Sequence, residues 1–169
     1  NTDRSPYLQF IVNAANIDLG VLHTTSTATA TATFSVKTYL ASGYVVMNAS
    51  PPPQNGAYTM NALSTPTASS VGTEQFGINL VNNTTVCGAP ANFGTNPLQV
   101  PDSSFSSGAA ATGYNTCGLF KYVNGDTIAE STKSSGETDY TISYIFNISN
   151  VTAGGTFTMN HVIVATSTF

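Results

Sequence analysis

Charged residues are scarce in this chain. Only 7% of its 169 residues are Asp, Glu, Lys or Arg, against about 25% in ordinary soluble domains. The four basic residues are scattered and the formal net charge is −4, so no basic surface for phosphate backbones can form and we expect no nucleic-acid partner. Serine and threonine fill the polar positions instead, 44 residues in all. A hydroxylated surface of this kind indicates an extracellular or cell-wall setting.

Long hydrophobic runs are also absent. No stretch approaches the roughly 18 apolar residues that a membrane-spanning helix needs, so we expect no membrane span in the mature chain. No basic segment followed by an apolar one opens the sequence, as a signal peptide would. We therefore interpret Asn1 as the start of a processed chain. The prediction is an extracellular or cell-surface protein whose signal peptide has been removed.

Cysteine occurs only twice, at Cys87 and Cys117, each in a glycine-rich stretch. We predict a disulfide between them, which would close a loop of about 30 residues and contribute about 3–4 kcal/mol in the chain-entropy model. Two unpaired thiols are the alternative. A zinc site is disfavoured, because no histidine lies near the two cysteines to complete a tetrahedron.

Catalytic and metal-binding motifs are lacking as well. The two histidines, His23 and His161, lie in no recognisable triad, and we expect both in solvent or at the edge of the core. Hydrolysis by paired carboxylates would have to use two of a few acids that form no motif, namely Asp102, Asp126, Glu130 and Asp139. The segment 123–127 is interpreted as a hairpin turn rather than a calcium loop. We predict no catalytic residue, no metal, no cofactor and no enzymatic activity.

The pattern that the sequence does have is alternation of apolar and polar residues, the period of a half-buried strand. Over 28–36, alanine, phenylalanine and valine share one face, while every threonine and serine lies on the other. Alternate residues from Tyr140 to Ile148 are apolar in the same way. Further strands are predicted over 7–12, 17–22, 44–47, 58–60, 74–81 and 157–169, with a loop-rich region over 82–116.

Short strands separated by Gly, Pro and Asn turns predict an all-β fold. Their number, about 8–10, indicates a single Greek-key sandwich, immunoglobulin-like or jelly-roll-like, that spans residues 1–169. A barrel is the alternative.

The first strand leads to a hypothesis about assembly. Leu8, Phe10 and Val12 share one face close to the start of the chain. Such a strand can fold into its own sandwich, or it can insert into a neighbouring subunit by β-strand addition. We therefore treat residues 1–13 as a candidate N-terminal donor strand, and both alternatives stay open.

Three stretches, 64–80, 112–115 and 138–144, resemble a group of uncharacterised secreted proteins from small-genome candidate-phylum bacteria. The segment 17–22, leading into a Thr/Ala strand, is similar to bacterial surface sandwiches such as spore-coat-like pilins, camelysin-type fibre proteins and wall-binding domains. These resemblances imply export, a sandwich fold and assembly on the cell surface. They carry over no catalytic residue.

Two functions compete at this point. The first is a structural subunit of an extracellular, pilus-like filament whose partners are copies of itself, assembled head-to-tail by strand donation. The second is a non-polymeric surface adhesin or carbohydrate-binding module, in which Phe93, Tyr114 and Tyr122 would face host-cell or wall glycans. The absence of Trp weakens the second. Asn-x-Ser/Thr acceptor sequences for glycans occur at Asn48, Asn82, Asn83, Asn147 and Asn150.

Overall fold

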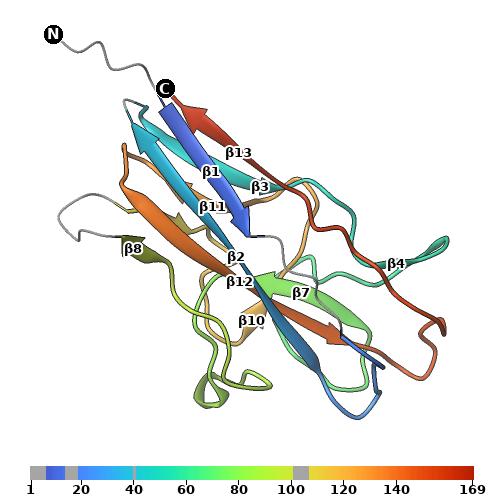
Figure 1. Ribbon diagram of the computed structural model, residues 1–169. Helices are drawn as coiled ribbons and strands as arrows, with labels where there is room; N and C mark the ends of the chain where they lie inside the picture. Colours follow the sequence, from blue (N-terminus) through green and yellow to red (C-terminus); the bar gives the residue numbers. More distant parts are fainter. Residues whose placement is uncertain (1–6, 14–18, 40, 101–106) are drawn as a thin grey trace, which may run out of the picture.

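The computed structural model describes residues 7–13, 19–39, 41–100 and 107–169 (Figure 1). Its elements are thirteen strands and one short 3-10 helix, η1 (Thr85–Cys87). The strands are β1 (Tyr7–Asn13), β2 (Ala28–Tyr39), β3 (Gly43–Asn48), β4 (Gln54–Asn55), β5 (Tyr58–Thr59), β6 (Thr67–Ala68), β7 (Gln75–Asn79), β8 (Leu98–Val100), β9 (Ala109–Ala110), β10 (Leu119–Phe120), β11 (Thr127–Ser131), β12 (Glu137–Asn147) and β13 (Ile163–Thr168). Five of them are two residues long. The number of longer strands is eight, which lies within the predicted range of about 8–10 strands.

Two antiparallel sheets form the sandwich. The larger sheet has the order β1-β2-β12-β7, with β8 also paired to β12, and the smaller has the order β13-β3-β11-β9. The short pairs β10-β6 and β4-β5 lie outside these two sheets. The prediction of an all-β sandwich is confirmed, while the Greek-key path of the chain stays a prediction.

The core between the sheets follows the predicted alternation. Phe34 and Val36 of β2 are buried, whereas Thr31 and Thr33 of the same strand are exposed. The Phe34 ring stacks on Tyr140 of β12, with 4.8 Å between ring centroids. The Tyr140 hydroxyl lies 2.6 Å from the Tyr44 hydroxyl of β3 in the other sheet. This contact satisfies two buried polar groups in an otherwise apolar layer.

The outer face of β12 is buried too, which the alternation does not predict. Ser143 and Ile145 lie on that face and neither is exposed. The loop-rich region packs so closely against Ser143 that a Cβ at Gly94 would lie 2.1 Å from Ser143 Oγ. A third layer therefore covers this part of the larger sheet.

Two predicted strands differ from the structure. Residues 19–22 form no strand, and residues 17 and 18 lie outside the described part of the chain. The last strand begins only at Ile163, because Thr158 makes an isolated bridge to Gln54 and the His161 side chain bonds to Tyr144 and Asn48. These contacts take the segment before β13 out of the sheet's regular ladder.

Candidate functional site at the open side of the sandwich

Strand β1 lies at the end of the larger sheet and pairs with β2 of the same chain. The register runs from Tyr7 opposite Tyr39 to Asn13 opposite Thr33. No other strand of the described residues pairs with β1. Strand β13 lies at the corresponding end of the smaller sheet, and Figure 1 shows β1 and β13 side by side along one edge of the sandwich. We call this edge the open side.

The three predicted donor residues point toward the core but are not fully covered. Leu8 and Phe10 are partly buried against the core, and the Phe10 ring meets Phe34 edge-on at 6.0 Å. Val12 is 50% exposed. Strand β1 is therefore held by one ladder and two half-buried side chains. Its pairing within the same chain is what the structure describes, and donation to a neighbour stays a prediction.

An apolar groove of about 950 Å³ continues the open side beyond the end of β1. Its lining includes Val12, Leu22, Phe146, Phe157 and Met159. It lies where the described pairing of β1 with β2 ends, at Asn13 opposite Thr33. Among the described residues that line the groove, none is Asp, Glu, Lys or Arg.

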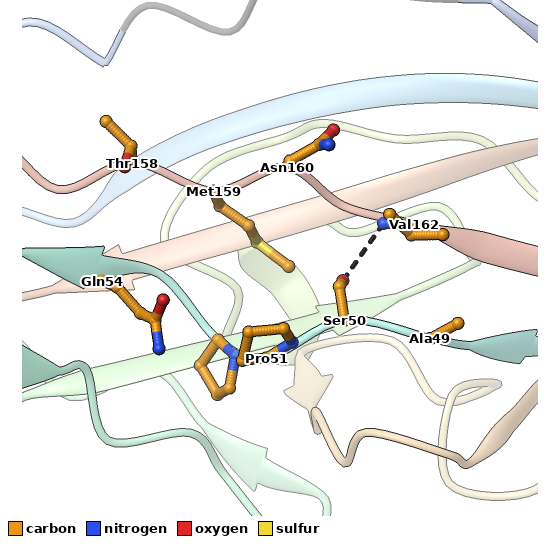
Figure 2. Close-up of a pocket in the computed structure, with 9 residues that line it drawn as sticks. Ala49, Ser50, Pro51, Gln54, Thr158, Met159, Asn160 and Val162 are labelled. Carbon is orange, nitrogen blue, oxygen red and sulfur yellow. Dashed lines mark hydrogen bonds between the residues drawn. The ribbon is translucent and has the colours of Figure 1, made fainter. Parts of the chain in front are cut away.

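A smaller hollow of about 410 Å³ lies between residues 49–54 and 158–162 (Figure 2). In Figure 2 the Met159 side chain extends from one wall toward Ser50 and Pro51 on the other. The Ser50 hydroxyl accepts a hydrogen bond of 3.1 Å from the Val162 amide. This bond closes the hollow at one end, and no ionisable side chain lines it.

His161 joins the two sheets next to both hollows. Its Nε2 lies 2.8 Å from Asn48 Oδ1, which can only accept, so Nε2 carries the proton. Nδ1 therefore accepts a 2.6 Å hydrogen bond from the Tyr144 hydroxyl. Burial lowers the pKa of His161 to about 4. His161 is half-buried, as expected of a histidine at the edge of the core, but the sequence did not predict that it bridges the two sheets.

The loop-rich end carries the disulfide, and the predicted bond between Cys87 and Cys117 is confirmed. Beside it, the side chains of Asn79 and Asn83 exchange two hydrogen bonds, of 2.7 and 2.8 Å. Both amides are fully buried, so the pair satisfies groups that would otherwise be costly to desolvate. A disulfide is typical of proteins from oxidising compartments.

The aromatic residues proposed to face a glycan do not form a platform. Tyr114 and Tyr122 are buried, so that prediction is wrong for these two rings. Phe93 is partly buried and stacks on Phe120, with 6.1 Å between ring centroids. One covered ring offers no extended surface for a sugar.

Tyr114 instead belongs to a buried polar contact. Its hydroxyl donates to Asp126 Oδ2 at 2.8 Å, and Lys121 Nζ lies 2.8 Å from the same oxygen. Partial burial raises the pKa of Asp126, but the hydrogen bonds from Lys121 and Tyr114 outweigh it and lower that pKa overall. The carboxylate is thus fixed as a charged structural partner.

The remaining acids considered for catalysis are not brought together as a site. Among the described residues, no group of three or more His, Cys, Asp or Glu could hold a metal ion. Asp139 accepts a hydrogen bond from Ser35 at 2.7 Å, whereas Glu130 lies in β11 of the other sheet. Asp102 lies outside the described residues. The absence of enzymatic activity stays a prediction.

The five glycan acceptor sequences differ in accessibility. Asn48, Asn83 and Asn147 are buried and hydrogen-bonded. Asn82 and Asn150 are exposed and lie outside the strands. Only these two side chains are open to a modifying enzyme in the folded chain.

Comparisons with protein-family models, with curated proteins and with solved structures found no match. The resemblances noted in the sequence therefore stay predictions. No helix in the described part of the chain is long and apolar enough to cross a membrane.

Proposed function

We propose that this protein is a structural subunit of an extracellular filament, in which β1 of each subunit completes the sandwich of the next. The observation that carries the proposal is the position of β1. It is an end strand without charge, held by a single ladder, yet it covers the fully buried Phe34 and Val36. A subunit that released β1 would need another copy of the same strand to cover these residues.

The contacts favour exchange between identical subunits. A donated β1 would restore the seven residue pairs with β2 and the contact of Phe10 with Phe34. Leu8 and Phe10, each half-buried, together contribute about 2–4 kcal/mol before the cost of ordering. Because a swapped strand makes the same contacts in either subunit, the free energy of exchange is small and assembly depends on concentration.

The geometry of exchange gives an open chain of subunits. Each subunit offers β1 to one neighbour and accepts β1 from another, so the contact is heterologous and need not close. An extracellular setting is supported by the disulfide and by the low content of charged residues. Filaments, rather than discrete particles, are the expected product.

Electron microscopy of the purified chain tests this function. Phe10→Asp places a charge on the core face of β1 and should abolish filaments. Gln9→Asp adds the same charge to the other face of the same strand and serves as the matched control, which should still assemble. Discrete particles from the wild-type chain at high concentration, or filaments from Phe10→Asp, would contradict the proposal.

A further inference from the structure

The open side has a second property that strand donation does not use. β1 and β13 each end a sheet, and each has a neighbouring strand on one edge only among the described residues. Their other edges carry backbone N–H and C=O groups that can pair with a further strand. A donated β1 would occupy the same position, so this outer edge exists whichever subunit supplies the strand.

Among the described residues, both edges lack the usual protection. Proteins normally block an exposed edge with a charged side chain, a proline, a bulge or a covering loop. Neither Tyr7–Asn13 nor Ile163–Thr168 contains a charged residue or a proline. Neither pairing, β1 with β2 or β13 with β3, shows a register shift, whereas β11 with β3 does.

The opposite end of the larger sheet is covered. There Phe76 of β7 exchanges backbone hydrogen bonds with residues 61 and 63, and Ile78 exchanges two more with Lys121. All five residues of β7 are buried. Within the part of the chain that the structure describes, one end strand of this sheet is therefore covered and the other is not, although β1 is the longer of the two.

Apolar side chains lie next to the uncovered edges. Ile11 of β1 is 44% exposed and Val164 of β13 is 42% exposed, and Tyr7 and Val162 are similar. A strand added at either edge would cover part of these side chains as well as the backbone groups. The surface thus combines unpaired ladder positions with apolar area and no charge.

We propose that the open side is a contact between two copies of this chain, in which β1 of one copy pairs antiparallel with β1 of the other and β13 faces β13. A two-fold axis places each edge against its own copy, so uncharged meets uncharged and exposed apolar residues meet their equivalents. A charged partner would find nothing complementary on this side. In a filament, the same contact would join neighbouring filaments laterally.

The test first removes strand donation. Gln9 and Lys37 are opposite each other in the register, so Gln9→Cys with Lys37→Cys, oxidised in dilute monomer, locks β1 into its own subunit. Light scattering after size-exclusion chromatography then follows mass against concentration. We expect the locked chain to form dimers, and Ile11→Lys in the same background to raise the dissociation constant at least tenfold. Val86→Lys changes a 96% exposed valine next to Cys87 and is the matched control, with no effect expected.

The outcomes separate this inference from the proposed function. A locked chain that stays monomeric up to millimolar concentration, or one whose dimerisation is weakened equally by Ile11→Lys and Val86→Lys, would overturn the lateral contact. Locked dimers without filaments would support the lateral contact and also fit donation. If the locked chain forms filaments to the same extent as the wild-type chain, this result would contradict strand donation but not the lateral contact. Circular dichroism of each variant checks that it is folded.

Discussion

Acidification from pH 7.5 to pH 5.0 should destabilise the fold through His161. Burial lowers the pKa of this histidine to about 4, against about 6.5 in an unfolded chain. Between these two pKa values the unfolded chain binds a proton at His161 that the folded chain does not bind. The contribution of His161 to the free energy of unfolding is therefore complete above pH 6.5 and is lost as the pH falls toward 4. The difference corresponds to about 3 kcal/mol, of which about 2 kcal/mol is lost by pH 5.0. Its described contacts, Asn48, Tyr122 and Tyr144, are neutral and offer no counter-charge.

Urea unfolding followed by far-UV circular dichroism measures this loss. Glu74 and Asp126, whose pKa values are lowered, release their contributions only at more acidic pH. Burial and the neighbouring Asp139 raise the pKa of Glu137, so its contribution has the opposite sign, and the comparison with His161→Gln isolates the histidine. His161→Gln should be less stable at pH 7.5 and should lose most of the pH dependence. His23→Gln, the matched control, should keep it. A wild-type free energy of unfolding that is unchanged between the two pH values, or an equal loss in His161→Gln, would refute the reasoning.

Three further variants test the loop-rich end. Replacing Cys87 and Cys117 together by Ser should lower the free energy of unfolding by about 3–4 kcal/mol, because the loop closed by the disulfide spans a separation of 30 residues; a loss below 1 kcal/mol would contradict this. Tyr114→Phe should lower the free energy of unfolding by about 1–2 kcal/mol at neutral pH, because Asp126 loses a hydrogen bond. An unchanged free energy of unfolding would show that this hydrogen bond does not stabilise the fold. Gly94→Ala should cost about 1–3 kcal/mol because its φ is +82° and a Cβ would lie 2.8 Å from a backbone oxygen; thermal unfolding at an unchanged temperature would argue against this close packing.

The sequence predicted those parts of the fold that depend on local period. Alternation in β2 and β12 marks their core faces, because successive side chains of a strand point to opposite sides whatever surrounds them. The Cys87–Cys117 pair follows from the presence of only two cysteines in a chain of extracellular composition. These features need no knowledge of distant contacts.

The features that sequence reasoning missed depend on contacts between distant segments. The alternation predicts that Ser143 and Ile145 face solvent, yet both are buried, and the loop-rich region packs against Ser143. Tyr114 was assigned to a ligand surface, but Asp126 and Lys121 hold it in the interior. The only local signal for such a cover is the concentration of Gly, Asn and Pro over 82–116, which indicates loops without indicating where they pack.

Whether β1 belongs to its own subunit or to the next is the central claim, and a disulfide trap measures it directly. The double variant Gln9→Cys with Lys37→Cys is first assembled under reducing conditions in which the reduced chain stays folded. It is then oxidised, and the products are separated by non-reducing electrophoresis. Ser35→Cys with Asp139→Cys joins β2 to β12 within one chain and serves as the control, since these residues are also register partners. Donation predicts a ladder of covalent multimers for the first pair and monomers for the second. Monomers alone from both pairs, in samples that contain filaments, would contradict assembly by donation of β1.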